Sequence, residues 1–153
     1  MNAILKNHNI SHQSAAQKML YLTLKNKSDE LNKLNVWINN DIATLFKLSE
    51  NVVFKIDLTL TELIANIISY GYPNQCESDI NIKCQCLNGI IKIKVEDTGI
   101  PFNPLEIPDI ILPQSLEEAD IGGLGIFMIR KYIDESSYQR ENNKNIFTMQ
   151  FKI

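Results

Sequence analysis

Three polar side chains interrupt the apolar segment TELIANIISYGYPN, residues 61–74, at a spacing that could support chemistry. Glu62, Asn66 and Tyr70 follow one another at four-residue steps, so on a helix they lie one above another, about 6 Å apart along the axis. A carboxylate and an amide in this position can hold a hydrated Mg²⁺ and orient a hydroxyl, because Mg²⁺ prefers few protein oxygens and keeps its waters. The alternative is a solvated helix edge, which is what most polar helical residues form.

A second candidate group follows the apolar stretch 90–97, in the segment VEDTGIPFNP. Asp97 ends a predicted buried strand, and Gly99 lets the chain turn sharply and lets a ligand approach the backbone. A buried carboxylate can accept a hydrogen bond from an exocyclic amine such as that of adenine. The alternative is an Asx turn that only ends the strand.

A third candidate group is the glycine cluster in IGGLGIFMIRKYID. Gly122, Gly123 and Gly125 precede a predicted helix, where freed backbone amides and the helix dipole favour an anion such as phosphate. The alternative is a flexible hinge or an ordinary helix start. The cluster fits neither the Walker phosphate-binding pattern nor a GxGxxG pattern placed after a strand, so by itself it is a weak signal.

The elements that position these groups are predicted by hydrophobic periodicity. Apolar residues at steps of three and four predict helices over 31–46 and 51–70, and Gly71 with Pro73 ends the second. An alternating pattern predicts an early strand within 15–24. Two further strands, over 79–87 and 90–97, are joined by Asn88-Gly89, which predicts a type I′ hairpin turn.

Periodicity fails between Thr98 and Asp120, where four of the five prolines of the chain predict a long loop. Long loops in compact domains are usually lids, binding loops or disordered segments. A helix over 126–134 and a second hairpin over 136–153, with its turn near 142–144, follow the loop. The element order predicts an α+β fold, a two-layer sandwich in which a mixed, mostly antiparallel sheet carries about three helices on one face.

The composition limits the classes of function. The chain has 153 residues, of which 44% are hydrophobic and 22% charged, and this predicts one globular domain over 15–153 after a tail at 1–14. A net charge of −3 argues against nucleic acid as a partner. The sequence has neither a long apolar run nor a signal-like segment, so we expect no membrane association and a cytoplasmic location. Its cysteines lack the spacing of a zinc site or a disulfide framework, and its two histidines lie in the predicted tail without nearby acidic or cysteine partners: Cys76, Cys84, Cys86, His8 and His12.

The order of the three groups is more specific than any one of them. Along the chain the order is E-x-x-x-N on a helix, D-x-G after a strand, a long loop, and then GGLG before a helix. In this order the chain resembles the GHKL-type ATPase domains, the superfamily of DNA gyrase, heat-shock chaperones, histidine kinases and MutL. It is most similar to the stand-alone anti-sigma-factor serine kinases, because ELIANIISYGYP matches the N box, VEDTGIPFNP the first glycine box and IGGLGIFMIRKYIDESSY the second. The resemblance covers about 22–153 and implies the Bergerat ATP-binding fold.

The resemblance implies a role for each matched residue. Asn66 would coordinate the Mg²⁺ that bridges the ATP phosphates, and Glu62 would be the general base that receives the proton of an attacking hydroxyl. Asp97 would accept a hydrogen bond from the adenine amino group, and Gly99 would let the base lie against the backbone. The remaining implied nucleotide contacts come from the phosphate-facing end of a lid loop over 100–120: Gly122, Gly123, Leu124 and Gly125.

The resemblance also implies partners. The acceptor would be a serine on a small STAS-type anti-sigma-factor antagonist, and a sigma factor would be sequestered when the antagonist is not engaged. A homodimer is implied in the same way. The chain would then be an ATP- and Mg²⁺-dependent serine/threonine protein kinase and anti-sigma factor in a bacterial partner-switching pathway that regulates transcription.

The predicted lid departs from what phosphoryl transfer normally uses. Between Thr98 and Met128 the sequence has no Lys or Arg, although this chemistry relies on cations near the developing charge. Arg130 and Lys131 lie one to two turns into the following helix. The acidic residues of this stretch are Glu106, Asp109, Glu117, Glu118 and Asp120. An alternative of another class therefore stays open, an ATP-binding regulatory module that acts by partner capture with little or no kinase activity.

Overall fold

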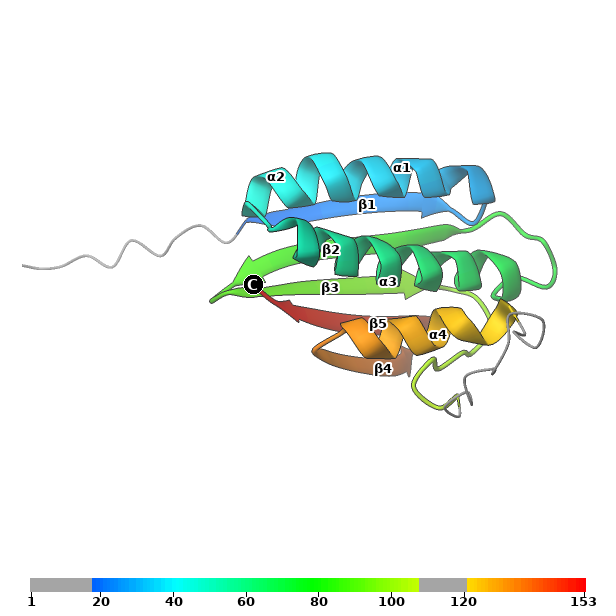
Figure 1. Ribbon diagram of the computed structural model, residues 1–153. Helices are drawn as coiled ribbons and strands as arrows, with labels where there is room; N and C mark the ends of the chain where they lie inside the picture. The colour runs from blue at the N-terminus through cyan, green and yellow to red at the C-terminus, as the bar shows by residue number, and fades with distance from the viewer. Residues whose placement is uncertain (1–17, 108–120) are drawn as a thin grey trace, which may run out of the picture.

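One layer of the molecule is a five-stranded sheet and the other is made of helices (Figure 1). The computed structural model describes residues 18–107 and 121–153, and of residues 121–124 it describes only the backbone. The predicted tail at 1–14 and residues 108–120 of the predicted lid loop lie outside the described residues. Residues 100–107 of that loop are described, and they form turns and irregular backbone.

The sheet is antiparallel at every pairing among the described strands. The strands are β1 (Met19–Lys25), β2 (Asp79–Leu87), β3 (Ile90–Asp97), β4 (Glu135–Glu141) and β5 (Lys144–Lys152). They lie in the order β1-β2-β3-β5-β4, so the last strand of the chain sits inside the sheet, between β3 and β4. The predicted α+β class and two-layer architecture are confirmed.

Both hairpin turns have positive backbone φ angles, which the sequence predicts for the first of them. Asn88 and Gly89 have φ of 51° and 74° between β2 and β3. Asn142 and Asn143 have φ of 50° and 61° between β4 and β5. Positive φ at both central residues is the mark of a type I′ turn, whose twist matches that of the flanking strands. The two predicted hairpins are therefore confirmed.

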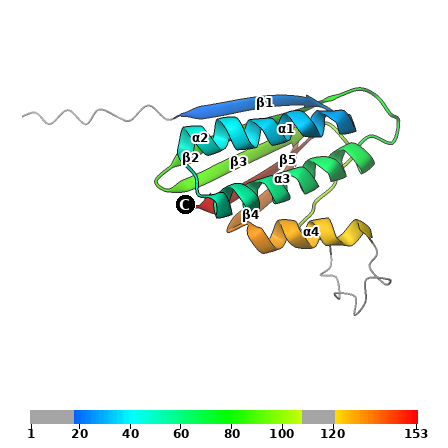
Figure 2. The same cartoon turned by 45° about the horizontal axis from the view of Figure 1, so that its top comes forward.

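Three helical segments cover one face of the sheet (Figures 1 and 2). The first is a continuous run that begins in a 3-10 turn and widens to a π-helix in its middle: η1 (Ser28–Glu30), α1 (Leu31–Val36), η2 (Trp37–Ile42) and α2 (Ala43–Phe46). The second is α3 (Glu50–Tyr70) and the third is α4 (Ile121–Tyr132), which lies beside α3. Within the described ranges, no helix is long and apolar enough to cross a membrane.

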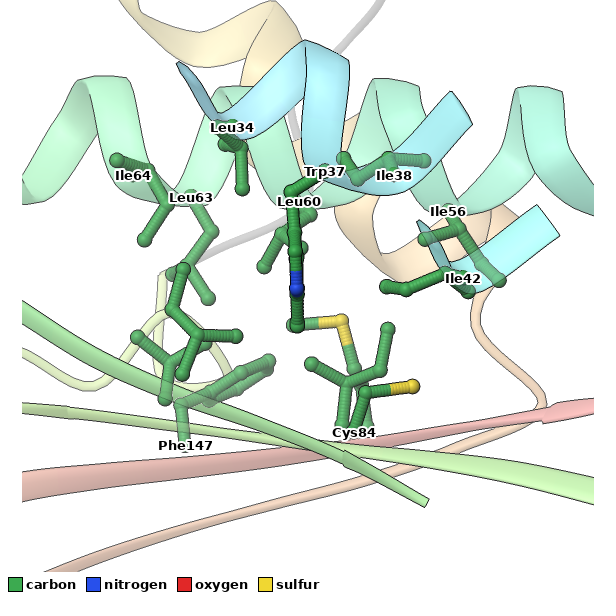
Figure 3. Close-up of a cluster of buried hydrophobic side chains, with 14 of the residues drawn as sticks. Leu34, Trp37, Ile38, Ile42, Ile56, Leu60, Leu63, Ile64, Cys84 and Phe147 are labelled. Carbon is green, nitrogen blue, oxygen red and sulfur yellow. The ribbon is translucent and has the colours of Figure 1, made fainter. Parts of the chain in front are cut away.

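The helix α3 is fixed at both ends and along one face. The Ser49 hydroxyl accepts a hydrogen bond from Val52 N at its start, and the Gly71 N–H donates to Ile67 O at its end. Its buried residues recur at steps of three and four: Val52, Ile56, Thr59, Leu60, Leu63, Ile64 and Ile67. Figure 3 shows part of this face above the sheet residues Cys84 and Phe147, beside apolar side chains of the first helical segment. Burial of each such aliphatic side chain contributes about 1.5–3 kcal/mol to the stability of the fold. This packing fixes the helix on the sheet, and the polar residues of α3 are thereby held at fixed positions.

The last helix begins earlier than the sequence predicts. The sequence predicts a helix over 126–134. The observed helix, α4, begins at Ile121 and ends at Tyr132. The glycine cluster therefore lies inside the first turns of the helix rather than in front of it. A glycine costs a helix only about 1 kcal/mol relative to alanine, and packing against a neighbouring helix outweighs costs of that size. The prediction was wrong because it treated glycines as a helix boundary.

The three free cysteines differ in burial, and this generates a test of the sheet register. Cys84 is buried and Cys76 is exposed. Burial, with a smaller effect of neighbouring Cys86, raises the pKa of the Cys84 thiol to about 12. Since the thiolate is the reactive form, we expect iodoacetamide at pH 8 to label Cys76 first and to leave Cys84 unmodified in the native protein. Peptide mass spectrometry of native and urea-unfolded samples measures this, and rapid native labelling of Cys84 would contradict the register.

Candidate functional site

The site is built where the C-terminal half of α3 faces the ends of β3 and β5. A small pocket of about 40 Å³ lies there. Its lining residues come from α3, from the ends of these strands and from the segment that follows β3: Leu63, Asn66, Ile67, Tyr70, Gly71, Asp97, Ile100, Phe102, Pro104, Tyr138, Asn145 and Phe147. The structure thus brings together Asn66 and Asp97, which the sequence singles out separately.

Asn66 presents an unsatisfied polar atom to this pocket. Its side-chain Nδ2 is buried and has no hydrogen-bond partner among the described residues. A buried polar atom without a partner costs about 1–3 kcal/mol, so its retention points to a ligand. The two ends of an amide are assigned by hydrogen bonding, and with its oxygen turned to the same place Asn66 is a suitable Mg²⁺ ligand.

A metal ion here would need other ligands besides this amide. The described part of the chain contains no group of three or more His, Cys, Asp and Glu side chains that could hold one. Mg²⁺ usually takes one or two protein oxygens and completes its shell with water and nucleotide phosphates. A single asparagine beside a pocket therefore fits a metal that enters with a nucleotide, and it does not fit a metal held by the protein alone.

Glu62 lies one turn before Asn66 on α3 and faces a different hollow. It lines an open groove between α1 and α3, together with Asn35, Asp57 and Thr61. It also lies against α4, because a Cβ atom added at Gly125 would collide with Glu62 Oε2. A glycine at 125 is thus what allows α4 to pass close to this carboxylate.

The Asp97 carboxylate is held at the end of β3 by donors on one of its two oxygens. Asp97 Oδ1 accepts hydrogen bonds from the Gly99 N–H at 2.8 Å and from Asn145 Nδ2 at 2.9 Å. The side chain is buried, and this burial raises the pKa of Asp97, while Asn145, Gly99 and the charge of Arg140 act in the opposite direction. The carboxylate is therefore desolvated and positioned, as a hydrogen-bond acceptor for a ligand must be.

Gly99 is required by a close approach of two backbones. A Cβ atom at this position would lie 2.7 Å from Gly71 O and 2.9 Å from Asp97 Oδ1. The next residue, Ile100, donates its N–H to the same Gly71 O at 2.8 Å. Contacts this short against backbone leave no room for a side chain, so the end of α3 requires a glycine at 99. The predicted approach of a ligand to the backbone at Gly99 stays a prediction.

The sequence did not single out three residues of the site: Asn145, Tyr138 and Arg140. Asn145 lies directly opposite Asp97 in the β3–β5 register, and its Oδ1 accepts hydrogen bonds from Tyr138 and Arg140. Arg140 Nη1 also donates to Gly99 O at 3.1 Å. The sequence did contain a sign of Asn145. Alternate residues of β5 face the core, and Asn145 is the one polar residue among them, beside Phe147, Met149 and Phe151.

The two cations near the predicted lid have partners within the protein, Arg130 with backbone and Lys131 with an aromatic ring. Arg130 Nη2 donates to Pro104 O at 3.0 Å and to Ile107 O. Lys131 lies over the Tyr132 ring, with Nζ 5.6 Å from its centroid. Gly122, Gly123 and Leu124 lie in the first turn of α4, and because only their backbone is described, their nucleotide contacts stay predictions.

The buried charge of Asp97 predicts a stability cost that asparagine would remove. A raised pKa in the fold means that this carboxyl group favours the folded state below its unfolded pKa of about 3.9, and that the benefit is lost as pH rises. At pH 7 Asp97→Asn keeps an acceptor for Gly99 and Asn145 and removes the desolvated charge. We expect its melting temperature without nucleotide to rise by a few degrees, since about 1 kcal/mol shifts Tm by roughly 2–4 °C in a domain of this size.

Calorimetry at pH 7 and pH 4 measures this effect, and the gain should shrink at the lower pH. Asp41→Asn, at an exposed position of η2, is the matched control and should leave Tm unchanged. A lower Tm of Asp97→Asn at pH 7 would mean that the carboxylate stabilises the fold, contrary to this account.

Comparison with known proteins places the chain in a family. A family model for the histidine kinase-like ATPase domain matches residues 25–151. The serine/threonine-protein kinase BtrW of Bordetella bronchiseptica is 25% identical over 113 residues, which cover 74% of this chain and 79% of BtrW. The solved structure of the RsbU and RsbW domains of Rv1364c from Mycobacterium tuberculosis matches with a TM-score of 0.60 at 12% identity, over 88% of this chain. This chain spans 32% of the length of that one, and the likeness shows the fold. Because the family model matches most of its length, the protein belongs to the histidine kinase-like ATPase domain family.

Proposed function

We propose that this protein is a Mg·ATP-dependent serine/threonine protein kinase. The observation that carries the proposal is the arrangement of Glu62 and Asn66 on α3. Asn66 presents an unsatisfied buried amide to a pocket that also contains Asp97, while Glu62 faces a separate groove one turn away. One helix therefore offers a nucleotide side and an acceptor side. The similarity to a curated serine/threonine-protein kinase supports the same reading.

On the nucleotide side, the described residues would bind and orient ATP. Asp97 accepts a hydrogen bond from the adenine amino group, and Gly99 keeps the backbone close to the base. Asn66 would hold the Mg²⁺ that enters with the nucleotide. When bound, Mg²⁺ would neutralise charge on the transferring phosphoryl group. Gly122, Gly123, Leu124 and Gly125, at the start of α4, would provide the phosphate contacts at a helix N-terminus.

On the acceptor side, Glu62 would take the proton of a serine hydroxyl while the serine oxygen bonds to the γ-phosphorus of ATP and ADP leaves. The groove beside it has polar walls, and the Asp57 carboxylate in it is oriented by Asn35 Nδ2 at 3.3 Å and by Thr61 Oγ1 at 3.3 Å. A general base must lie within hydrogen-bonding distance of the proton it removes. The groove gives a protein segment a route to Glu62 that does not cross the nucleotide pocket.

The proposed partners follow from the family resemblance. The acceptor is a serine of a STAS-type anti-sigma-factor antagonist, and a sigma factor is bound when that antagonist is absent, so the protein acts in a partner-switching pathway that regulates transcription. We propose that it works as a homodimer in the cytoplasm. The fold it shares with the RsbW-containing structure is compatible with this role.

A second candidate function has one observation in its favour. The chain has two arginines, and each donates to backbone carbonyl oxygens: Arg130 to Pro104 and Ile107, and Arg140 to Gly99. Phosphoryl transfer usually employs such cations on the transferring group. An ATP-binding module that acts by partner capture, with little or no kinase activity, would not need them. The two functions differ in whether phosphate moves to the bound antagonist.

Replacing the proposed base separates these functions. With γ-labelled ATP, Mg²⁺ and a STAS-type antagonist from the same genome, we expect serine phosphorylation by the wild type. Glu62→Gln should slow it by about 10²- to 10⁴-fold without weakening ATP binding, because Glu62 does not line the nucleotide pocket. Glu50→Gln, at the exposed start of the same helix, is the matched control and should be unaffected. Full activity of Glu62→Gln would remove Glu62 from the mechanism, and no labelling by the wild type would favour partner capture.

The contact between Gly125 and Glu62 gives a second prediction. An alanine at 125 is favoured in a helix by about 1 kcal/mol, but its Cβ would displace the Glu62 carboxylate. We therefore expect Gly125→Ala to fold with an unchanged or higher Tm and to lose phosphotransfer. Titration of this variant with ATP separates a displaced Glu62 from a lost phosphate contact at Gly125, because only the second weakens ATP binding. Ser69→Ala, at an exposed position of α3, is the control that changes helix propensity away from Glu62. A stable Gly125→Ala variant with wild-type phosphotransfer would show that the position of Glu62 does not matter.

A further inference from the structure

Asn145 is a buried amide whose orientation is fixed by its neighbours. Its Oδ1 accepts hydrogen bonds from the Tyr138 hydroxyl and from Arg140 Nη1, each at 2.8 Å. An arginine can only donate, so the reverse orientation would set the Asn145 NH₂ group against the guanidinium. The hydrogen-bond network therefore determines which end of the amide faces Asp97.

The opposite end of Asn145 determines which oxygen of Asp97 is free. Asn145 Nδ2 donates to Asp97 Oδ1 at 2.9 Å and to Ile100 O at 2.9 Å. The Gly99 N–H donates to the same Asp97 Oδ1 at 2.8 Å. Two donors thus occupy Oδ1, and the described residues give Oδ2 no partner. Since Asp97 lines the pocket, Oδ2 is the oxygen left for a ligand.

We propose that Asn145, oriented by Tyr138 and Arg140, is a positioning residue that fixes which end of the side chain at position 97 faces the nucleotide base. We call Asn145, Tyr138 and Arg140 the clamp. The proposal rests on the proposed function, because it assigns the nucleotide base to this pocket. An ionised carboxylate accepts at either oxygen, so in the wild type Asp97 itself supplies the acceptor, which pairs with a 6-amino group and opposes a 6-oxo group, and the clamp positions it. Sites built to pair one polar group reject the mismatched group because a buried atom is left unpaired.

The clamp predicts more than a preference of the wild type. In Asp97→Asn the side-chain oxygen would stay with the two donors, Gly99 N–H and Asn145 Nδ2, so the new NH₂ group would be forced toward the pocket. A donor there pairs with a 6-oxo purine. An asparagine without the clamp would turn either end to the ligand and would discriminate little.

Calorimetric titration with Mg·ATP and Mg·ITP tests this, because the two nucleotides differ at the 6-position of the base. We expect the wild type to bind ATP at least about tenfold more tightly than ITP, and Asp97→Asn to reverse the ratio. Adding Asn145→Ala to Asp97→Asn should bring the ratio back toward one. A purely structural role of Asn145 would lower both affinities together and leave their ratio unchanged.

The outcomes separate this proposal from the proposed function. Circular dichroism checks that Asp97→Asn is folded. If the folded variant still prefers ATP, or binds neither nucleotide, the role of the clamp is overturned. A double variant with the same ratio as Asp97→Asn would overturn the role of Asn145. Asp41→Asn is the control and should keep the wild-type ratio. Failure of the wild type to bind ATP would overturn both proposals, whereas ATP binding with an unchanged ratio in Asp97→Asn overturns this one alone.

Discussion

The close approach of two backbones at Gly71 and Gly99 is the constraint on which the rest of the site depends. Gly71 follows α3 and Gly99 follows β3, and a Cβ atom at Gly99 would lie 2.7 Å from Gly71 O. The Ile100 N–H closes the contact by donating to that oxygen. The end of the helix is thereby joined to the end of the sheet without an intervening side chain. Asn66 and Asp97, from two different layers, line one pocket for this reason.

Local sequence patterns predicted most helices and strands. The features that they did not predict depend on contacts between residues far apart in the sequence. The apolar spacing of α3 and the Asn88-Gly89 turn each carry their structure in a few neighbouring residues, so helix and hairpin followed from the sequence. The start of α4 did not, because its glycines are accommodated by packing against α3. Asn145 lies opposite Asp97 because of the β3–β5 register, and these two residues are 48 positions apart in the sequence. Such a pairing is set by the whole sheet and leaves little local trace.

The two arginines of the site hold backbone carbonyl oxygens and the Asn145 amide around the Asp97 carboxylate. Arg140 and Asn145 support the Asp97 loop, and Arg130 fastens the segment that follows it through Pro104. Glu62 adds a second carboxylate on the other side of Asn66. In the proposed complex, the described residues would offer the base end of a nucleotide a preorganised acceptor. They would leave most charge compensation at the phosphate end to Mg²⁺. This division explains why the geometry supports nucleotide binding more strongly than it supports a fast transfer step.

ATP would bind in the pocket between α3 and the ends of β3 and β5, with Mg²⁺ held by Asn66. Isothermal titration of the wild type and of Asn66→Ala with ATP, each with Mg²⁺ and with excess EDTA, tests it most directly. We expect saturable binding to the wild type that is tighter with Mg²⁺ than with EDTA, and a loss of that Mg²⁺ dependence in Asn66→Ala. No ATP binding by the folded wild type, or the same Mg²⁺ dependence in both proteins, would contradict it.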